Sequence, residues 1–307
     1  ALSSLAGSAL AALSPAQLSY ARARAGFAMN RRLQGADGEF INAPNPDGPV
    51  DHDVPVLRVE DAAGKLRAIL FGYACHNTTL TQHSYVYCGD YAGYAQEYLQ
   101  GDHPGVVALF MTGCGGDQNP YPRGNLALAQ SHGRSLATAV DAALATTPKP
   151  LAGPLRSAYA EIDLRYSPAP SRAEYEKRLE SREKYLADHA RRMLRRLDQE
   201  GRLPATYPYP LQVVRFGDDL RLVALGGEAV VDYSLRLKKE FGGPASVWVA
   251  AYSNDVPGYI PSERVLREGG YEGLHATRLG SLHPGPWAPG LEEQIIAKVH
   301  ELDRATQ

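Results

Sequence analysis

The chain has 307 residues, of which 44% are hydrophobic and 21% charged, and its formal net charge is −2. These values are ordinary for a globular protein, and the near balance of charges excludes a strongly basic nucleic-acid-binding protein. No apolar run approaches the roughly 20 residues that a membrane-spanning helix requires.

The first segment, residues 1–13, is rich in alanine and leucine at helical spacing, and Ser14-Pro15 ends it. The chain opens here without an initiator methionine or a basic leader. We therefore expect it to be the later part of a longer protein. Residues 33–53 carry Gly, Pro, Asn and Asp throughout, which predicts a loop.

Alternating or continuous apolar runs predict seven strands, and Ala- or Leu-rich stretches predict helices between them. The strands are expected at 54–60, 67–74, 106–111, 157–166, 212–216, 220–225 and 246–251. The helices are expected at 90–100, with Asp90 as N-cap, at 125–146, and from the residues after Glu228 to about 241. Short turn sequences predict two hairpins. One joins the strands at 54–60 and 67–74, and the other joins the strands at 212–216 and 220–225 through 217–219. The pattern predicts an α/β fold with a mixed β-sheet core and flanking helices.

One long charged helix is expected at 171–200, between Pro168-Ala-Pro170 and Gly201. Its charged residues stand at spacings that allow i,i+4 pairs, and its apolar residues are few. We interpret it as a solvated arm or connector; a partner-binding helix is the alternative.

The three cysteines, Cys75, Cys88 and Cys114, are too few for a disulfide scaffold. A single bridge or a metal role remains open, but buried structural thiols are favoured because free Cys is among the most buried residue types.

Polar residues follow several predicted strands where each strand ends. His76 follows one strand, a glycine-rich stretch from Gly113 to Pro120 follows another, and Glu228 and Tyr259 follow two more. Side chains at such ends are accessible to substrates. Each also has a structural interpretation: a surface histidine, a glutamate at a helix N-terminus and a packed tyrosine.

These stretches resemble the neutral/alkaline (non-lysosomal) ceramidase family. That family has a His-x-Thr-Ser stretch, a Ser-Gly-Asp-Asn-x-Gly-Tyr-Ala stretch and an Asn-x-Gly-Asp-x-Ser-Pro stretch. This chain has, in the same order, His76-Asn-Thr-Thr, Cys88-Gly-Asp-Tyr-Ala-Gly-Tyr94 and Gly113-Cys-Gly-Gly-Asp-Gln-Asn-Pro120. The likeness extends from about Asn30 to about Val299, as a single ceramidase-like domain over 1–307 in which 171–200 forms an arm.

The resemblance implies a Zn²⁺ ion held by two histidines, a glutamate and a tyrosine. Carried over, the ligands are His76, Glu228 and Tyr259. The remaining histidine belongs to a segment that would precede Ala1. As a separate or cleaved chain, that segment would be a partner that supplies this ligand; without it, this chain offers at most three ligands.

The family's catalytic serine aligns with Gly113, which has no side chain. The resemblance therefore implies that metal-activated water attacks directly, or that Cys114 serves as the nucleophile. The amides of Gly115 and Gly116 would form an oxyanion nest.

Four further residues are assigned to the site or its surroundings. Asp117 is a catalytic candidate that would orient neighbouring groups, and Asp90 would do the same around the metal ligands. His83 is a polar histidine with no matched role, and we assign it to the surroundings of the site. Arg31 is interpreted as an ion-pair partner, with contact to a substrate carboxylate or carbonyl as the alternative.

The sequence thus predicts a zinc-dependent hydrolase that cleaves an amide (N-acyl) or related bond in an N-acylated lipid or glycan-type substrate. Two alternatives remain: a metal-assisted lyase acting on uronic-acid polysaccharide, and a non-catalytic glycan- or lipid-binding module on the same fold. From the family alone we expect a secreted or periplasmic protein.

Overall fold

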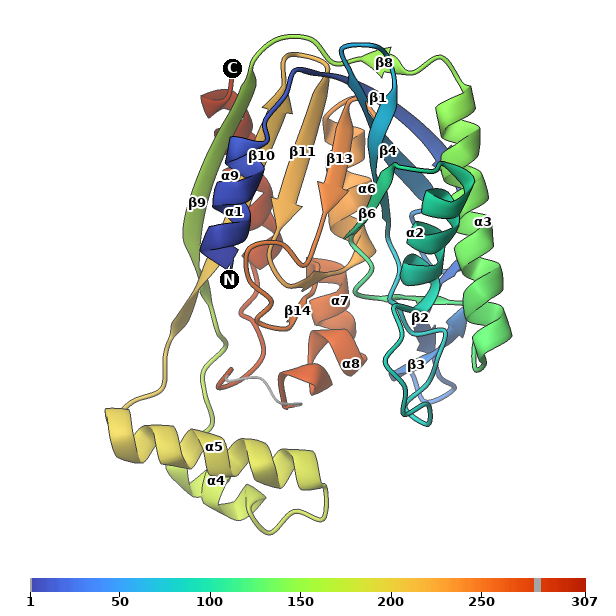
Figure 1. Cartoon of the computed structure of the whole chain (residues 1–307). Helices are drawn as coiled ribbons and strands as arrows, with labels where there is room; N and C mark the ends of the chain where they lie inside the picture. Colours follow the sequence, from blue (N-terminus) through green and yellow to red (C-terminus); the bar gives the residue numbers. More distant parts are fainter. Residues whose placement is uncertain (1, 279–282) are drawn as a thin grey trace.

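Two larger sheets with helices on their flanks form the core of the computed structural model, which describes residues 2–278 and 283–307 (Figure 1). The first sheet has the order β6-β5-β4-β1-β8. Its strands are β1 (Ala16–Arg24), β4 (Asp53–Asp61), β5 (Leu66–Tyr73), β6 (Val107–Thr112) and β8 (Lys149–Pro150). Only β5 and β6 are parallel; the other pairs are antiparallel. Helices α2 (Asp90–Asp102) and α3 (Leu126–Ala145) pack against this sheet.

The second sheet has the order β13-β11-β10-β9. Its strands are β9 (Leu155–Arg165), β10 (Thr206–Phe216), β11 (Leu220–Leu225) and β13 (Val247–Ala250). Helix α9 (Leu291–Ala305) covers β9 and β10, and α6 (Val231–Glu240) packs on β13. A bridge between Gly113 and Ala250 joins the edge of the first sheet to that of the second. The prediction of an α/β fold with a mixed-sheet core is confirmed, as are both hairpins.

Several short elements complete the chain between the two sheets. Strands β2 (Ala28–Gln34), β3 (Phe40–Asn45) and β7 (Gln118–Pro120) form a small antiparallel sheet, so much of the loop predicted at 33–53 is a hairpin. Strands β12 (Glu228–Ala229) and β14 (Tyr259–Ile260) pair in parallel. Helices α7 (Glu263–Glu268) and α8 (Gly270–Gly273) and the 3₁₀ turn η1 (His275–Arg278) follow β14.

The long charged helix predicted at 171–200 is two helices instead of one. Helix α4 (Arg172–Arg178) and helix α5 (Lys184–Glu200) fold against each other as an arm that projects from the sheets (Figure 1). The arm has its own small apolar cluster, which includes Tyr175 and Met193. The Tyr175 hydroxyl donates to the Pro284 carbonyl, and this anchor holds the arm to the chain before α9.

Helix α1 (Leu2–Ala11) is formed as predicted over the residues described, and none of its residues is buried. Of the three thiols, Cys75 and Cys114 are buried as expected, whereas Cys88 is exposed. All three are free. No helix within the described ranges is long and apolar enough to span a membrane.

Candidate functional site

Three strand ends bring His76, Glu228 and Tyr259 into contact. His76 follows β5, while Glu228 and Tyr259 are paired residues of β12 and β14. The Nε2 atom of His76 lies 3.1 Å from Glu228 Oε2 and 3.2 Å from Tyr259 Oη. The side chains of His76 and Glu228 are only 13% and 21% exposed. We call these three residues the polar cluster.

The orientation of His76 is fixed by the backbone behind it. Its Nδ1 atom lies 3.0 Å from the carbonyl oxygen of Gln118, and the peptide N–H of His76 donates to the same oxygen. Because a carbonyl only accepts, Nδ1 must carry a proton, and the lone pair of neutral His76 is left on Nε2, which faces Glu228 and Tyr259. A histidine that binds a metal is held in this way, with its second nitrogen donating to a carbonyl.

Tyr252, which the sequence analysis assigned no role, also belongs to this site. Its hydroxyl donates to Glu228 Oε2 at 3.2 Å and lies 3.4 Å from His76 Nε2. Tyr252 follows β13 in a left-handed backbone conformation, with φ of 55°. A tyrosine just past the end of a buried strand was the available signal, the same one that singled out His76.

Arg31 fixes the hydroxyl of Tyr259 from the other side. The Arg31 guanidinium donates to Tyr259 Oη at 3.0 Å, to Asn119 Oδ1 at 3.2 Å and to Glu272 Oε1 at 2.8 Å. The expected ion pair of Arg31 is therefore present, and its partner is Glu272. Arg32 binds the second oxygen of the same carboxylate at 2.7 Å. Both arginines and Glu272 are buried.

The protonation states follow from these contacts. Burial raises the pKa of Glu228, but the His76 ring, which donates from Nε2 when it is protonated, and the hydroxyls of Tyr259 and Tyr252 outweigh it and leave the pKa below its usual value. Burial raises the pKa of Tyr259, and the neighbouring charge of Arg31 only partly opposes this. The cluster thus presents an anionic carboxylate beside protonated phenols.

The glycine-rich loop, residues 113–120, joins these strand ends. A side chain at Gly115 would begin 2.7 Å from the peptide nitrogen of Cys75, and one at Gly116 would begin 2.5 Å from the carbonyl of Glu228. Only glycine permits so close an approach. The proposed oxyanion nest is wrong, because the Gly115 and Gly116 amides already donate to the carbonyls of Gly113 and Ala229.

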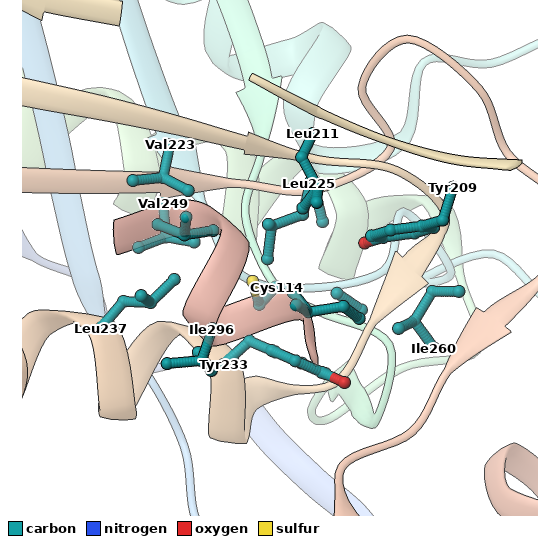
Figure 2. Packing of buried hydrophobic residues seen from close by; sticks show 14 of the residues in the cluster. Cys114, Tyr209, Leu211, Val223, Leu225, Tyr233, Leu237, Val249, Ile260 and Ile296 are labelled. Carbon is teal, nitrogen blue, oxygen red and sulfur yellow. The ribbon is translucent and has the colours of Figure 1, made fainter. Parts of the chain in front are cut away.

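The interpretation of Cys114 as a nucleophile does not fit the structure. Its sulfur lies in the apolar core among Leu225, Tyr233 and Val249 (Figure 2). The residue is 0% exposed, and burial, followed by the charge of Asp51, raises the pKa of its thiol. A catalytic thiol needs the opposite: access to solvent and a lowered pKa.

Gly113, aligned above with the family's serine, pairs with Ala250 and borders a cavity that Trp248 also lines. No contact between Gly113 and the polar cluster is recorded among the described residues. Asn119 instead contacts Arg31 at the cluster. Residues Gly116–Pro120 match the family's Gly-Asp-x-Ser-Pro pattern. In this match Asn119, and not Gly113, stands at the position of the serine.

Asp117 is fully buried and holds the loop in place without contacting the polar cluster. Its Oδ1 accepts from the Val231 amide at the start of α6, and its Oδ2 accepts from Asn30 Nδ2. Burial raises the pKa of Asp117 to about 7, and the Val231 hydrogen bond opposes that rise. Asp117 is thus a positioning residue.

Asp90 and His83 lie apart from the polar cluster. Asp90 is the first residue of α2, after Gly89 as N-cap, so it is not the predicted cap itself. Its carboxylate accepts from the Leu80 amide at 2.8 Å and so holds the loop that follows His76. His83 is exposed in that loop, and within the described residues no contact connects it to the site.

The donor set of the polar cluster fits zinc, which takes imidazole nitrogen and carboxylate oxygen. His76 and Glu228 supply these two donors, and the phenol of Tyr259 is the third. The described residues contain no group of three His, Cys, Asp or Glu side chains that would hold a metal. A cation here would therefore depend on tyrosine, or on a ligand from another segment, to complete its coordination.

No protein-family model and no curated protein matches the chain, but solved structures of ceramidases do. One is neutral ceramidase from Pseudomonas aeruginosa, with a TM-score of 0.65 and 19% identity over 87% of this chain. Another is a ceramidase complexed with C2, with a TM-score of 0.63 and 18% identity over 86% of this chain. The chain spans about half the length of each, 50% and 51%. The resemblance found in the sequence thus extends to the structure: the chain has the fold of neutral ceramidases.

Proposed function

We propose that the chain carries the reaction centre of a zinc-dependent hydrolase that cleaves the amide bond of an N-acylated compound. The observation that supports this most is the convergence of His76 Nε2, Glu228 Oε2 and Tyr259 Oη within hydrogen-bond distance. The carbonyl behind Nδ1 leaves the Nε2 lone pair free for a cation. The shared fold with ceramidases supports the choice of an amide bond.

His76, Glu228 and Tyr259 would hold the zinc, and a further histidine from outside this sequence would complete its coordination. Bound there, zinc supplies the Lewis acidity that activates water and polarises a carbonyl. The guanidinium of Arg31 fixes the phenol of Tyr259 and keeps positive charge near it.

Tyr252 is the proton-bearing group beside the reaction centre. Burial, and then the charge of Glu228, raise the pKa of its phenol well above the usual value, so it keeps its proton at neutral pH. Its hydroxyl lies 3.2 Å from Glu228 Oε2. We assign Tyr252 the role of hydrogen-bond donor to negative charge that develops on the substrate oxygen.

Metal analysis of the purified chain tests the proposal, before and after incubation with zinc. We expect one zinc per chain, lost in His76→Ala and retained in His83→Ala, the matched histidine outside the cluster. Release of amine from N-acyl substrates should follow the zinc content. A chain that binds no metal under either condition, or whose zinc is unaffected by His76→Ala, would refute the proposal and favour a binding module.

A further inference from the structure

A small cavity of about 40 Å³ lies beside the polar cluster, between β2, β3 and β7. Arg31 and Asn119 line it, and the same Arg31 guanidinium donates to Tyr259 Oη. Its lining includes two guanidinium groups and three carboxamides, and among the described residues no carboxylate borders it. The cavity is therefore a cationic, hydrogen-bonding pocket next to the proposed reaction centre.

Asn119 presents a free donor to this cavity. Its Oδ1 accepts from Arg31 at 3.2 Å and from the Thr78 hydroxyl at 3.1 Å, which fixes the carboxamide orientation. The Nδ2 group is left with no acceptor among the described residues, although Asn119 is only 6% exposed. This nitrogen is not among the buried side-chain atoms that lack a partner in the described chain, so it keeps access to solvent in the cavity and is available to an acceptor that enters it.

Arg123 supplies the uncompensated positive charge of the cavity. It lines the same cavity and is exposed, and no ion pair of its guanidinium is recorded among the described residues. Arg31 differs, because Glu272 already compensates its charge. The third carboxamide neighbour, Asn30, has both its side-chain oxygen and nitrogen engaged by protein groups. The unused donors are thus those of Asn119 and Arg123, together with the exposed carboxamide of Asn42.

We propose that this cavity is a carboxylate-binding subsite, and that the substrate is an N-acyl compound with a carboxylate close to the amide, such as an N-acyl amino acid. A planar carboxylate suits a guanidinium fork, and a cavity of this size admits such a group. The inference rests on the proposed function for the bond that is cleaved, but the subsite binds the carboxylate whether or not the bond breaks.

Calorimetry with an uncleavable probe tests the subsite. The probe is the ketomethylene analogue of N-hexanoylglycine, in which a methylene replaces the amide NH, and its neutral control is the primary amide of the same molecule. We expect the carboxylate to bind roughly 10- to 100-fold more tightly than the amide, as a charge-assisted hydrogen bond allows. Arg123→Gln should abolish this preference, because it weakens binding of the carboxylate more than binding of the amide.

Two further variants keep the test specific. Asn119→Asp, which keeps an acceptor for Arg31 and Thr78 but brings a negative charge to the cavity, should also abolish the preference. Arg156→Gln, on the exposed face of β9, should retain it. Equal affinities for the two probes in the unaltered chain, or a preference that survives both Arg123→Gln and Asn119→Asp, would overturn the proposal.

The two proposals fail in different ways. Zinc-dependent cleavage of neutral N-acyl amides without any preference for the carboxylate would sustain the hydrolase and refute the subsite. Tight binding of the carboxylate probe by a chain that takes up no zinc would sustain the subsite and refute the hydrolase.

Discussion

The two sides of the glycine-rich loop have opposite environments. Cys114 points into the apolar core between the second sheet and α6 and α9, where Leu225 and Tyr233 surround it (Figure 2). Asn119, on the same loop, contacts Arg31 and Thr78 beside the polar cluster. The cysteine, whose thiol is the more reactive group, lies on the apolar side of the loop. A catalytic role therefore cannot be assigned to a loop residue from its residue type alone. Four changes test this contrast.

The largest effect is expected from Arg31→Gln on the polar side. The change leaves Glu272 with one cation instead of two and removes donors from Tyr259 and Asn119. Breaking a buried ion pair costs about 3–5 kcal/mol of unfolding free energy. Urea denaturation measures it, with Arg156→Gln as an exposed control expected within about 0.5 kcal/mol of the unaltered chain. A loss of under about 1 kcal/mol would mean that the network is not stabilising.

Asp117→Asn should alter how stability depends on pH. The folded pKa of about 7 lies above the ordinary aspartate pKa of 3.8, so between these values the folded chain holds a proton that the unfolded chain has lost. The unfolding free energy therefore falls as pH rises from about 4 to about 7, on the order of 3 kcal/mol in total.

The asparagine variant should lack that fall, because it does not titrate. Denaturation of both proteins at about pH 5 and pH 8 measures the difference. The charged neighbours Asp232, Glu272 and Arg264 are common to both and cancel in the comparison. Equal changes in the two proteins would show that Asp117 is ionised throughout this range.

Gly116→Ala tests the join between the loop and β12. The new methyl group would lie 2.5 Å from the Glu228 carbonyl and must displace it. We expect a loss of about 1–3 kcal/mol in stability and roughly a tenfold loss in zinc affinity, since the ligand's support moves. Gly101→Ala, at an open helical position in α2, should instead be neutral or gain up to about 1 kcal/mol. Unchanged zinc affinity in the Gly116 variant would refute the coupling.

The smallest effect is expected from Cys114→Ala. Loss of a buried sulfur should cost about 1–2 kcal/mol through the small cavity left behind. Amide hydrolysis, measured well below the unfolding temperature, should be unchanged, because the thiol faces the core. If the Cys114→Ala chain folds but is inactive, the thiol takes part in catalysis and our interpretation of Cys114 is wrong.

Local signals in the sequence predicted the hairpins and the strand ends that carry the site. The hairpin of β10 and β11 is encoded by two apolar runs around Gly217-Asp218-Asp219, and His76 by its place after an apolar run. Such features depend on neighbours along the chain, and periodicity reveals them.

The features that the sequence did not predict depend on distant contacts. Arg31 and Glu272 are 241 residues apart, and nothing local pairs them. The break between α4 and α5 occurs among good helix formers, where packing of Tyr175 against the chain before α9 overrides propensity. The environment of Cys114 is likewise set by α6 and α9, far along the chain.

The pairing of β12 with β14 is only two residues long, yet it sets Glu228 beside Tyr259. His76 joins them from 152 and 183 residues away along the chain. A metal bound by all three would therefore report on the folding of the chain from His76 to Tyr259 at once. We expect zinc release to coincide with the global unfolding transition. Following the release of the ion would then measure how cooperatively the chain unfolds.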